Sequence, residues 1–557
     1  MQNSIAEQFN LHPLLAQLLI NRGVKKEKEI NHFLKPQLAD LNNPFLLDGV
    51  DKAINRIKKA FHNGEKILIY GDYDVDGITS TALLFLVLSN YSTNIYYYIP
   101  DRFEEGYGIG KKGIDFACRY GIDLVITVDC GITSIETIKE LKSNHIDTIV
   151  TDHHQPLNIL PEALAIINPK CCNYPFKELA GVGVAFKLAQ ALLSDNDQQK
   201  ESIYEHLDLV ALGTIADSVL LCGENRILVK NGIRQLQQTN KIGLRKLLTY
   251  KNRKLSEPVS TKDLAFDVIP ILNSAGRIAS SQLAVDLILT TSSYRAEYII
   301  KKMIVMNDKR KALTEKVLSE AKQMLQLKKN IDQLGVIVLA NYDWHPGVNG
   351  IVASKLMEEY NKPFVIISLR DGIGKGSGRN SGEFDFAKVL TQCSSTLNRF
   401  GGHQCAAGIT ILESQINEFD QTINKIIKKD SSKRDADKVI LKVDSEMIIE
   451  SIDWNLLKNL SILEPYGPGN PEPLFCSYHF PVISWKKVGK KQNHLKISLG
   501  KDGNYLNGIA FKMADRSEDI GNKMKKIDLV FQLGINRWNG QKSIQLLIKD
   551  IKLSEYQ

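Results

Sequence analysis

The chain has 557 residues, of which 43% are hydrophobic and 24% charged, a composition typical of folded proteins. One hydrophobic core rarely organises a chain of that length, so we expect about three or four domains. The net charge of +8 permits a polyanionic partner but does not require one. The segment from Met1 to Ile20 lacks the pattern of a signal peptide, and no run approaches the ~18 apolar residues of a membrane span. We therefore expect a soluble cytoplasmic protein with no membrane partner.

The eight cysteines are scattered, and none belongs to a Cys-x-x-Cys pair. A thiolate zinc site or a disulfide framework would need such paired spacings. We therefore expect reduced thiols, and any metal site has to be built from other side chains.

The first half of the chain alternates predicted strands and helices after a helical and loop-like start. We expect, in chain order, a helix at 50–63, a strand at 66–70, a helix at 79–88, strands at 94–100 and 123–128, a helix at 134–144, a strand at 147–151 and helices within 181–216. This βαβ order predicts a parallel sheet covered by helices.

The second half begins with a long helix and ends in a strand-rich region. Leu313, Val317, Ala321 and Met324 follow helical spacing, which predicts one extended helix that joins two domains. A second α/β unit follows, with a strand at 336–340, a helix at 348–360, a strand at 363–368 and glycine-rich stretches at 372–382 and 401–403. A charged linker at 428–438 leads into short strands with polar turns, the pattern of a small β-barrel.

Three polar motifs each follow a buried-type strand of the first half. They are Gly71-Asp72-Tyr73-Asp74-Val75-Asp76-Gly77, Thr127-Val128-Asp129-Cys130-Gly131 and Val150-Thr151-Asp152-His153-His154. Parallel strands present their carboxyl ends at one edge of a sheet, so the three motifs are predicted to meet in one crevice. So many carboxylates at close range would be destabilising unless cations compensated them.

The number and type of these side chains predict a site for two metal ions. Two ions roughly 3.5–4 Å apart would clamp a phosphate and convert a water into hydroxide. A carboxylate-rich site suits Mn²⁺ or Mg²⁺ better than zinc.

Simpler interpretations exist for each motif. Asp72-x-Asp74-x-Asp76-Gly77 resembles half of a calcium-binding loop, but position 12 of such a loop falls on Leu83 instead of a glutamate, and the segment follows a strand. Asp129 and Asp152 could cap helices or be solvated, and paired histidines often lie on surface loops. The coincidence of three motifs at neighbouring strand ends favours the metal site.

The ordered set of motifs resembles the DHH phosphoesterases and, within that superfamily, the RecJ family of single-strand-specific 5′→3′ DNA exonucleases. The resemblance extends from about residue 45 to residue 557. It is carried by the three motifs and by Glu105–Gly108, Gly181–Gly183, Asp217, Leu272–Arg277, Trp344–Val348, Gly376–Arg379, Gly401–His403 and Glu464–Pro471.

The resemblance implies a multidomain α/β protein. We expect an N-terminal segment at 1–45, a DHH catalytic domain with a parallel sheet at 46–290, a connecting helix at 291–330, a smaller α/β DHH-associated domain at 331–430 and an OB-type β-barrel at 435–557.

The resemblance also implies roles for the acidic and imidazole residues. The implied metal ligands are Asp74, Asp76, Asp129, His153 and Asp217, with Asp76 and Asp129 close to both ions. His154 is expected beside the scissile phosphate, where it would stabilise developing charge. Asp152 is expected to orient the histidines, and Asp72 to hold the turn without contacting metal.

The smaller α/β domain is expected to close over this site. Arg379 and the glycine-flanked Ser377 would bind phosphate, and Arg277 and His403 match substrate-side positions, Arg277 with a catalytic role. Taken alone, Ser377 could belong to a simple turn, and Arg277 could pair with a carboxylate.

Three positions depart from the family pattern. Asn380 stands where the family usually has serine, and Ser218 and Leu220 stand where valine and proline are common. None of these departures removes an implied ligand.

The barrel region is rich in basic and aromatic residues, which single-strand binders use to follow the backbone and to stack on bases. These residues are Trp485, Lys486, Lys487, Lys490, Lys491, His494, Lys496, Phe511, Lys512, Arg537 and Trp538. The simpler alternative is that the lysines are solvated and the tryptophans lie in the core.

The resemblance implies metal-dependent hydrolysis of single-stranded DNA from its 5′ end, with release of 5′-mononucleotides, in recombination and repair. The 5′ polarity comes from the resemblance alone. The implied partners are single-stranded DNA, single-strand-binding protein and recombination or repair proteins, and we expect a monomer. Two alternatives stay open: a DHH phosphodiesterase for short oligonucleotides or cyclic dinucleotides, which would not usually carry the barrel, and a non-catalytic DNA-binding scaffold, which would not need the ligands.

Overall fold

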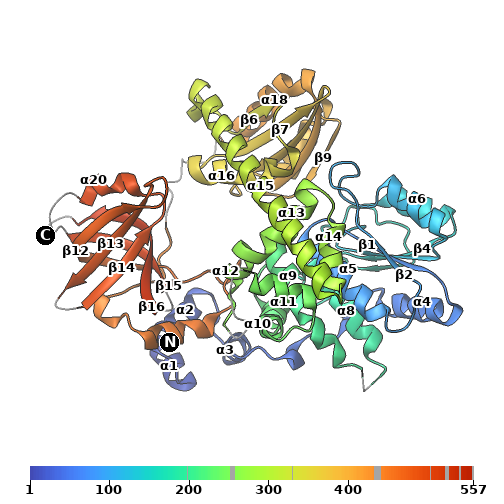
Figure 1. Ribbon diagram of the computed structural model, residues 1–557, viewed down its shortest axis with the longest axis horizontal. Helices are drawn as coiled ribbons and strands as arrows, with labels where there is room; N and C mark the ends of the chain where they lie inside the picture. Colours follow the sequence, from blue (N-terminus) through green and yellow to red (C-terminus); the bar gives the residue numbers. More distant parts are fainter. Residues whose placement is uncertain are drawn as a thin grey trace.

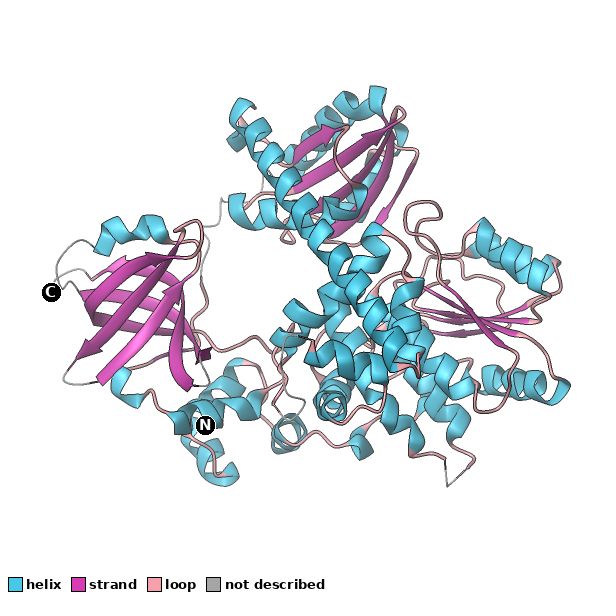
Figure 2. Cartoon of the chain, in the orientation of Figure 1, coloured by secondary structure: helices cyan, strands magenta, loops and turns pink. Residues whose placement is uncertain are grey.

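The computed structural model describes residues 1–196, 199–250, 257–328, 330–431, 441–501, 504–520, 526–538 and 541–554. Figure 1 shows two α/β regions linked by a long helix, with a β-barrel set apart from both. Figure 2, coloured by secondary structure, shows helices beside the strands in each of these parts. Among the described residues, no helix is long and apolar enough to cross a membrane.

The first α/β unit contains the predicted parallel sheet. Its elements are α4 (Val50–Asn63), β1 (Ile67–Gly71), α5 (Val75–Leu88), β2 (Ile95–Tyr98), α6 (Lys111–Tyr120), β3 (Leu124–Val128), α7 (Ile135–Ser143), β4 (Asp147–Thr151) and β5 (Ala165–Ile167). The strands lie in the order β2-β1-β3-β4-β5, and every pairing is parallel. Strands β1, β3 and β4 are therefore adjacent, which brings the ends of the three motif-bearing strands together.

Both faces of this sheet are buried, which explains the nearly unbroken apolar strands. Ile67 and Ile69 contribute to a core shared with α4, α5 and later helices, whereas Leu68 and Tyr70 pack into a second core with α6 and α7. The first core is completed by α8 (Gly181–Leu193), α9 (Leu207–Asp217), α10 (Gly223–Gln237), α11 (Ile242–Thr249), α13 (Ile269–Ile278) and α14 (Gln282–Leu289).

The predicted connecting helix is α15 (Ser293–Leu327), which crosses from the first α/β unit to the second (Figure 1). Val317 and Ala321 are fully buried against the second unit, and Leu313 and Met324 pack beside them. The apolar spacing therefore identified the face that this helix buries.

The second α/β unit contains β6 (Ile337–Asn341), α16 (Asn349–Tyr360), β7 (Phe364–Arg370), β8 (Ile373–Arg379), α17 (Phe386–Gln392), β9 (Arg399–Gly402), β10 (Ala406–Leu412) and α18 (Ile416–Ser431). Its strand order is β6-β7-β8-β10-β9, parallel only between β6 and β7. Each glycine-rich stretch contributes to a strand, β8 or β9. Close packing around β8 requires glycine, because Cβ atoms at Gly374, Gly376 and Gly378 would lie within 3 Å of neighbouring side chains. Residues 428–431 of the predicted linker are the end of α18, and residues 432–438 lie outside the described part of the chain.

The C-terminal region is a closed barrel, as predicted. Its strands are β11 (Ser445–Glu446), β12 (Phe475–Val488), β13 (His494–Lys501), β14 (Asn504–Ala510), β15 (Lys526–Trp538) and β16 (Gln541–Leu553). The sheet order is β11-β12-β13-β14-β16-β15, and an additional pairing between β12 and β15 closes it.

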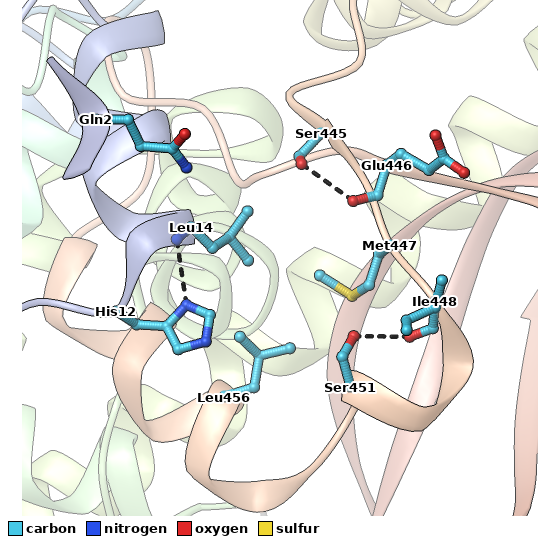
Figure 3. Close-up of a pocket in the computed structure, with 9 residues that line it drawn as sticks. All are labelled: Gln2, His12, Leu14, Ser445, Glu446, Met447, Ile448, Ser451 and Leu456. Carbon is cyan, nitrogen blue, oxygen red and sulfur yellow. Dashed lines mark hydrogen bonds between the residues drawn. The ribbon is translucent and has the colours of Figure 1, made fainter. Parts of the chain in front are cut away.

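The N-terminal helices share a core with this barrel and not with the sheet that follows them in sequence. Apolar residues of α1 (Gln2–Phe9), α2 (Pro13–Asn21) and α3 (Glu27–Leu34) pack into one cluster with α19 (Trp454–Leu460) and the barrel strands. A cavity of about 390 Å³ lies between α1, α2 and the segment that leads into the barrel, where Leu14, Met447 and Leu456 line it (Figure 3). None of its lining residues belongs to the acidic motifs.

Candidate metal centre and phosphate-binding site

The three acidic motifs converge at the carboxyl ends of β1, β3 and β4. Ligand atoms lie within 4.8 Å of one another in three groups, and all of these residues come from the motifs or from the end of α9. The groups are Asp72 with Asp74 and Asp129, Asp76 with His153 and Asp217, and Asp129 with His153 and His154. The structure therefore brings together every predicted metal ligand, and adds Asp72 to the set of possible ligands.

The first motif is shaped by the start of α5. Asp74 caps this helix: its Oδ1 accepts hydrogen bonds from the backbone N–H groups of Asp76 (2.9 Å) and Gly77 (3.2 Å). A Cβ at Gly77 would lie 2.5 Å from the carbonyl oxygen of Asp72, so close backbone packing requires glycine there. The cap starts α5 at Val75, four residues earlier than predicted.

Asp129 combines backbone strain with an unsatisfied side chain. Its φ of 60° lies in the left-handed region, which costs an L-residue such as aspartate roughly 1–2 kcal/mol. Its Oδ1 is buried without a hydrogen-bond donor from the described residues, and a Cβ at Gly181 would lie only 2.6 Å from it. Strain held in place by such tight packing is typical of functional sites.

Four buried polar atoms face one another without hydrogen-bond partners among the described residues: Asp72 Oδ1, Asp129 Oδ1, His153 Nε2 and Asp217 Oδ2. His153 Nε2 lies 3.1 Å from Asp129 Oδ1 and 3.6 Å from Asp217 Oδ2. Buried polar atoms normally find partners, because leaving them unsatisfied is costly. The four atoms are divided among the ligand groups described above, where divalent cations would satisfy them, so these side chains fit a metal site.

Electrostatics support the same conclusion. Burial, and then the neighbouring carboxylates, raise the pKa of Asp129 and of Asp76 well above the usual range. Burial lowers the pKa of His153 to about 4, so its imidazole is neutral at physiological pH and can act as a ligand.

Asp76 is also tied to the helix behind the site. Its Oδ2 accepts a hydrogen bond from the backbone N–H of Gly181 (2.7 Å), and its Oδ1 accepts one from Val182 (2.8 Å). These two donors belong to the first turn of α8, where unpaired N–H groups attract negative charge. The glycine motif at 181–183 thus orients a predicted ligand.

Asp152 holds the histidine segment in place. Its Oδ1 accepts hydrogen bonds from the backbone N–H groups of His153 (2.7 Å) and His154 (2.9 Å), and its Oδ2 accepts one from Ile132 (2.9 Å). It also lies 2.8 Å from Nδ1 of His154. Although burial opposes protonation of His154, the contact with Asp152 raises the pKa of His154 to about 9. In the metal-free chain, His154 is therefore protonated at neutral pH.

Tyr107 is a further site residue to which the sequence assigned no role. Its hydroxyl lies 2.9 Å from Nδ1 of His154 and donates a longer hydrogen bond (3.4 Å) to the carbonyl of Asp129. The available signal was its place within the Glu105–Gly108 motif, although that motif alone does not say which residue contacts the site.

The second α/β unit contacts the rim of this site. The ring of His403 stacks on His154 with centroids 5.8 Å apart, and Arg277 donates to the carbonyl of Gly347 (3.3 Å). Lys375 on β8 donates to the carbonyl of Phe103. Ser377 and Arg379 follow Lys375 at alternate positions of β8, so their side chains project from the same strand face.

Four half-buried arginines gather on this side: Arg102, Arg277, Arg310 and Arg379. Burial, and then the nearby charges of Arg102, Arg310 and Arg379, lower the pKa of Arg277 to about 9, against the opposing effect of Asp74. None of the four forms an ion pair with a carboxylate within the ranges that the structure describes. Such a cluster attracts a phosphate.

Arg102 and Arg310 were not predicted as site residues. Arg102 lies shortly after β2, at the same edge of the sheet as the acidic motifs, so strand position could have indicated it. Arg310 lies within α15, where helical periodicity marks it only as a polar position.

Comparison with known proteins defines the class of phosphoesterase. Residues 66–214 match the model described as DHH family, N-terminal domain, residues 333–429 match the DHHA1 domain, and residues 443–550 match the RecJ OB domain. The fold and the order of its domains are those of a DHH phosphoesterase.

Relatives that align over nearly the whole chain identify the family within this class. The chain is 37% identical over 558 residues to the single-stranded-DNA-specific exonuclease RecJ of Bacillus subtilis (strain 168), covering 100% of this chain and 70% of the relative. It is 34% identical to that of Escherichia coli (strain K12), covering 97% and 96%. A crystal structure of RecJ in complex with Mn²⁺ from Thermus thermophilus superposes with a TM-score of 0.84 at 28% identity, covering 100% of this chain and 78% of that one. The chain belongs to the RecJ family of single-stranded-DNA-specific exonucleases.

Proposed function

We propose that this protein is a single-stranded-DNA-specific 5′→3′ exonuclease that hydrolyses phosphodiester bonds and releases 5′-mononucleotides. The observation that carries this proposal is the cluster of buried, unsatisfied carboxylate and imidazole atoms, which faces a cluster of arginines within a chain of the RecJ family. A role in recombination and repair accords with the names of the relatives.

The proposed ligands of two divalent ions, Mn²⁺ or Mg²⁺, are Asp74, Asp76, Asp129, His153 and Asp217. Asp72 is a further candidate, because its unsatisfied Oδ1 belongs to the same group as Asp74 and Asp129. When bound, the ions would lower the pKa of the attacking water and neutralise charge on the phosphate.

The protein side chains would position the phosphate and balance its charge. The imidazolium of His154, held by Asp152, lies where it can donate to an oxygen that gains charge in the transition state. Arg277 and Arg379 would hold non-bridging oxygens with their forked N–H groups, with Ser377 and His403 at the rim. Arg102 and Arg310 add positive charge to the same region.

The barrel would bind the strand beyond the reacting end. Phe511 is 58% exposed, so its ring is available for stacking, and Lys512 follows it directly. Binding of single-strand-binding protein and of repair proteins, a monomeric state and a cytoplasmic location are further parts of this proposal.

The experiment that tests the proposal compares single strands that carry a label at either end, in Mn²⁺ and in EDTA. We expect a 5′ label to appear at once as mononucleotide, a 3′ label to remain on gradually shortened strands, and EDTA to stop both. Duplex DNA of the same sequence is the control and should stay intact. Digestion restricted to very short oligonucleotides or cyclic dinucleotides would indicate the DHH phosphodiesterase alternative, and binding without cleavage would indicate a scaffold.

A further inference from the structure

Helix α10 contains a buried arginine that contacts two segments distant in sequence. Arg226 is 2% exposed, and within the described part of the chain its guanidinium donates to backbone carbonyls alone. Nε bonds the carbonyl of Phe33 (2.9 Å), and the two Nη atoms bond the carbonyls of residues 463, 464 and 465 at 2.9 to 3.2 Å. The guanidinium also lies 3.9 Å from the centroid of the Phe33 ring. A buried guanidinium without a carboxylate is stable only when several acceptors surround it, so this residue is committed to these contacts.

The segment that Arg226 holds is the Glu464–Pro471 motif, which we call the joint loop. Its buried Asn470 donates to the carbonyls of Leu463 and Pro465, both at 2.8 Å, which closes the loop on itself. Arg22, which directly follows α2, donates to Oδ1 of Asn470 (2.7 Å) and to the carbonyl of Pro471 (2.7 Å). The joint loop is therefore a compact unit, fixed to the body formed by the N-terminal helices and the barrel.

The other side of the joint loop contacts the segment that follows Asp217. The backbone N–H of Leu221 donates to the carbonyl of Pro468 (2.7 Å), and a Cβ at Gly467 would lie 2.6 Å from Cδ1 of Leu221. Thr261 donates its hydroxyl to the carbonyl of Tyr466 (2.7 Å). Leu221 follows Asp217 by four residues, in the segment between α9 and α10. The joint loop therefore contacts the segment that follows a predicted metal ligand.

Other contacts between the two bodies are less buried. The ion pairs Lys262–Glu472 (3.6 Å) and Arg537–Glu257 (3.5 Å) have half-exposed lysine and arginine side chains, and Lys230 donates to the carbonyl of Leu34 (3.0 Å). The apolar cores of the two bodies are separate clusters. Exposed ion pairs contribute little, so the main specific connections among the described residues are the buried hydrogen bonds of Arg226, together with those of Leu221 and Thr261 to the joint loop.

We propose that Arg226 is a positioning residue, which fixes the barrel relative to the metal site by holding the joint loop against α10 and the segment after Asp217. A long strand bound by the barrel then enters the site in one register. This inference rests on the proposed function for its effect on DNA, but the fixed arrangement of the two bodies does not depend on it. Strands too short to reach the barrel need no such alignment.

The test compares Arg226→Lys and Arg226→Met with the exposed Arg234→Met on the same helix as control. We expect kcat/KM on long single strands to fall about tenfold or more, through KM, because two linked binding regions lose their shared geometry. On trinucleotides we expect kcat/KM to stay within about twofold of the unsubstituted protein, since so short a strand engages one region only. Equal losses on long and short strands, or no loss on long strands, would overturn the proposal.

A second readout does not require activity. Hydrogen exchange of the Leu221 amide, measured in the full chain, should accelerate in both Arg226 variants and not in Arg234→Met. If the Arg226 variants do not fold, Thr261→Val removes one half-buried bond to the joint loop and should shift the same amide and the same length dependence, more weakly. Unchanged exchange at Leu221 would contradict the proposal that Arg226 holds the joint loop in place. If the unsubstituted protein cleaves no single strand, the proposed function is rejected. If exchange at Leu221 still accelerates in the Arg226 variants, the positioning role of Arg226 is nevertheless supported.

Discussion

The two α/β units present side chains of opposite charge where they meet. The first unit ends its parallel strands in carboxylates that are buried, strained or unsatisfied, as Asp129 illustrates. The second unit is largely antiparallel and presents Lys375, Ser377 and Arg379 from one face of β8. A cluster of carboxylates requires cations and a cluster of arginines requires anions, so neither side is complete alone.

The carboxylates and the arginines lie near one another, yet they do not form ion pairs among the described residues. Asp74 is close enough to raise the pKa of Arg277, yet no ion pair joins them among the described residues. Two clusters that neutralised each other directly would form a structural salt-bridge network. Clusters that remain separate can hold metal ions on one side and a phosphate between them.

The largest expected effect comes from the acidic side. Asp129→Ala removes the carboxylate that belongs to two of the ligand groups, so nuclease activity should fall by about 1000-fold or more, the scale seen when a residue that acts on the reacting atoms is lost. The measurement is release of labelled mononucleotide in Mn²⁺. The control is Asp115→Ala on the exposed face of α6, which should leave activity unchanged. Substantial Mn²⁺-dependent activity in Asp129→Ala would contradict the role assigned to the acidic side.

The next largest effect comes from the basic side. Arg379→Lys keeps the charge but removes the forked geometry, and we expect a loss of about 100-fold in kcat/KM, comparable to removal of one donor to a developing oxyanion. Steady-state kinetics on labelled single strands measure the change. Arg370→Lys, at the exposed end of β7, is the matched control. Equal activity in the two variants would show that β8 contributes no phosphate contact.

A smaller effect is expected where the two units touch directly. His403→Ala removes the ring that stacks on His154, and we expect about a tenfold loss in kcat/KM because His154 keeps its bond to Asp152. His403→Phe preserves a ring and should recover most of the activity if stacking alone matters. Activity that stays low in His403→Phe would instead assign the imidazole nitrogens a contact with substrate.

The smallest effect concerns stability without metal. Burial, and then Asp74, raise the pKa of Asp72 to about 8 in the folded chain, so the folded form keeps a proton that the unfolded chain loses at about pH 4. The stability contributed by the protonated Asp72 is present at low pH and is lost as pH rises from about 4 to about 8. Asp72→Asn should therefore raise the Tm of metal-free protein by a few degrees more at about pH 8 than at about pH 5. An equal difference at both pH values would contradict the raised pKa.

Much of the fold could be predicted because apolar periodicity reports burial. The sheet of the first unit, α4 and α15 follow directly from such patterns. The start of α5 could not be placed, because it depends on the side chain of Asp74 bonding two backbone N–H groups. The packing of the N-terminal helices on the barrel depends on contacts between positions distant in sequence, such as Asn21 with Asp444, which local patterns do not contain.

In the site, too, some features follow from local sequence and others depend on tertiary contacts. Strand ends and motif order predicted which acidic residues and histidines gather, and the structure places them within one cluster. The left-handed backbone of Asp129 and the contact of Tyr107 with His154 could not be predicted, because both arise from tertiary packing. Arg310 is brought to the site by the path of α15 and has no local signal.

The central claim is that the buried acidic cluster holds two divalent cations. Calorimetric titration of the metal-free protein with Mn²⁺, in parallel with Asp129→Ala, tests it most directly. We expect about two ions per chain in the unsubstituted protein, and loss of at least one of them in the variant, because Asp129 belongs to two ligand groups. Absence of Mn²⁺ binding, or identical stoichiometry and affinity in Asp129→Ala, would contradict the account.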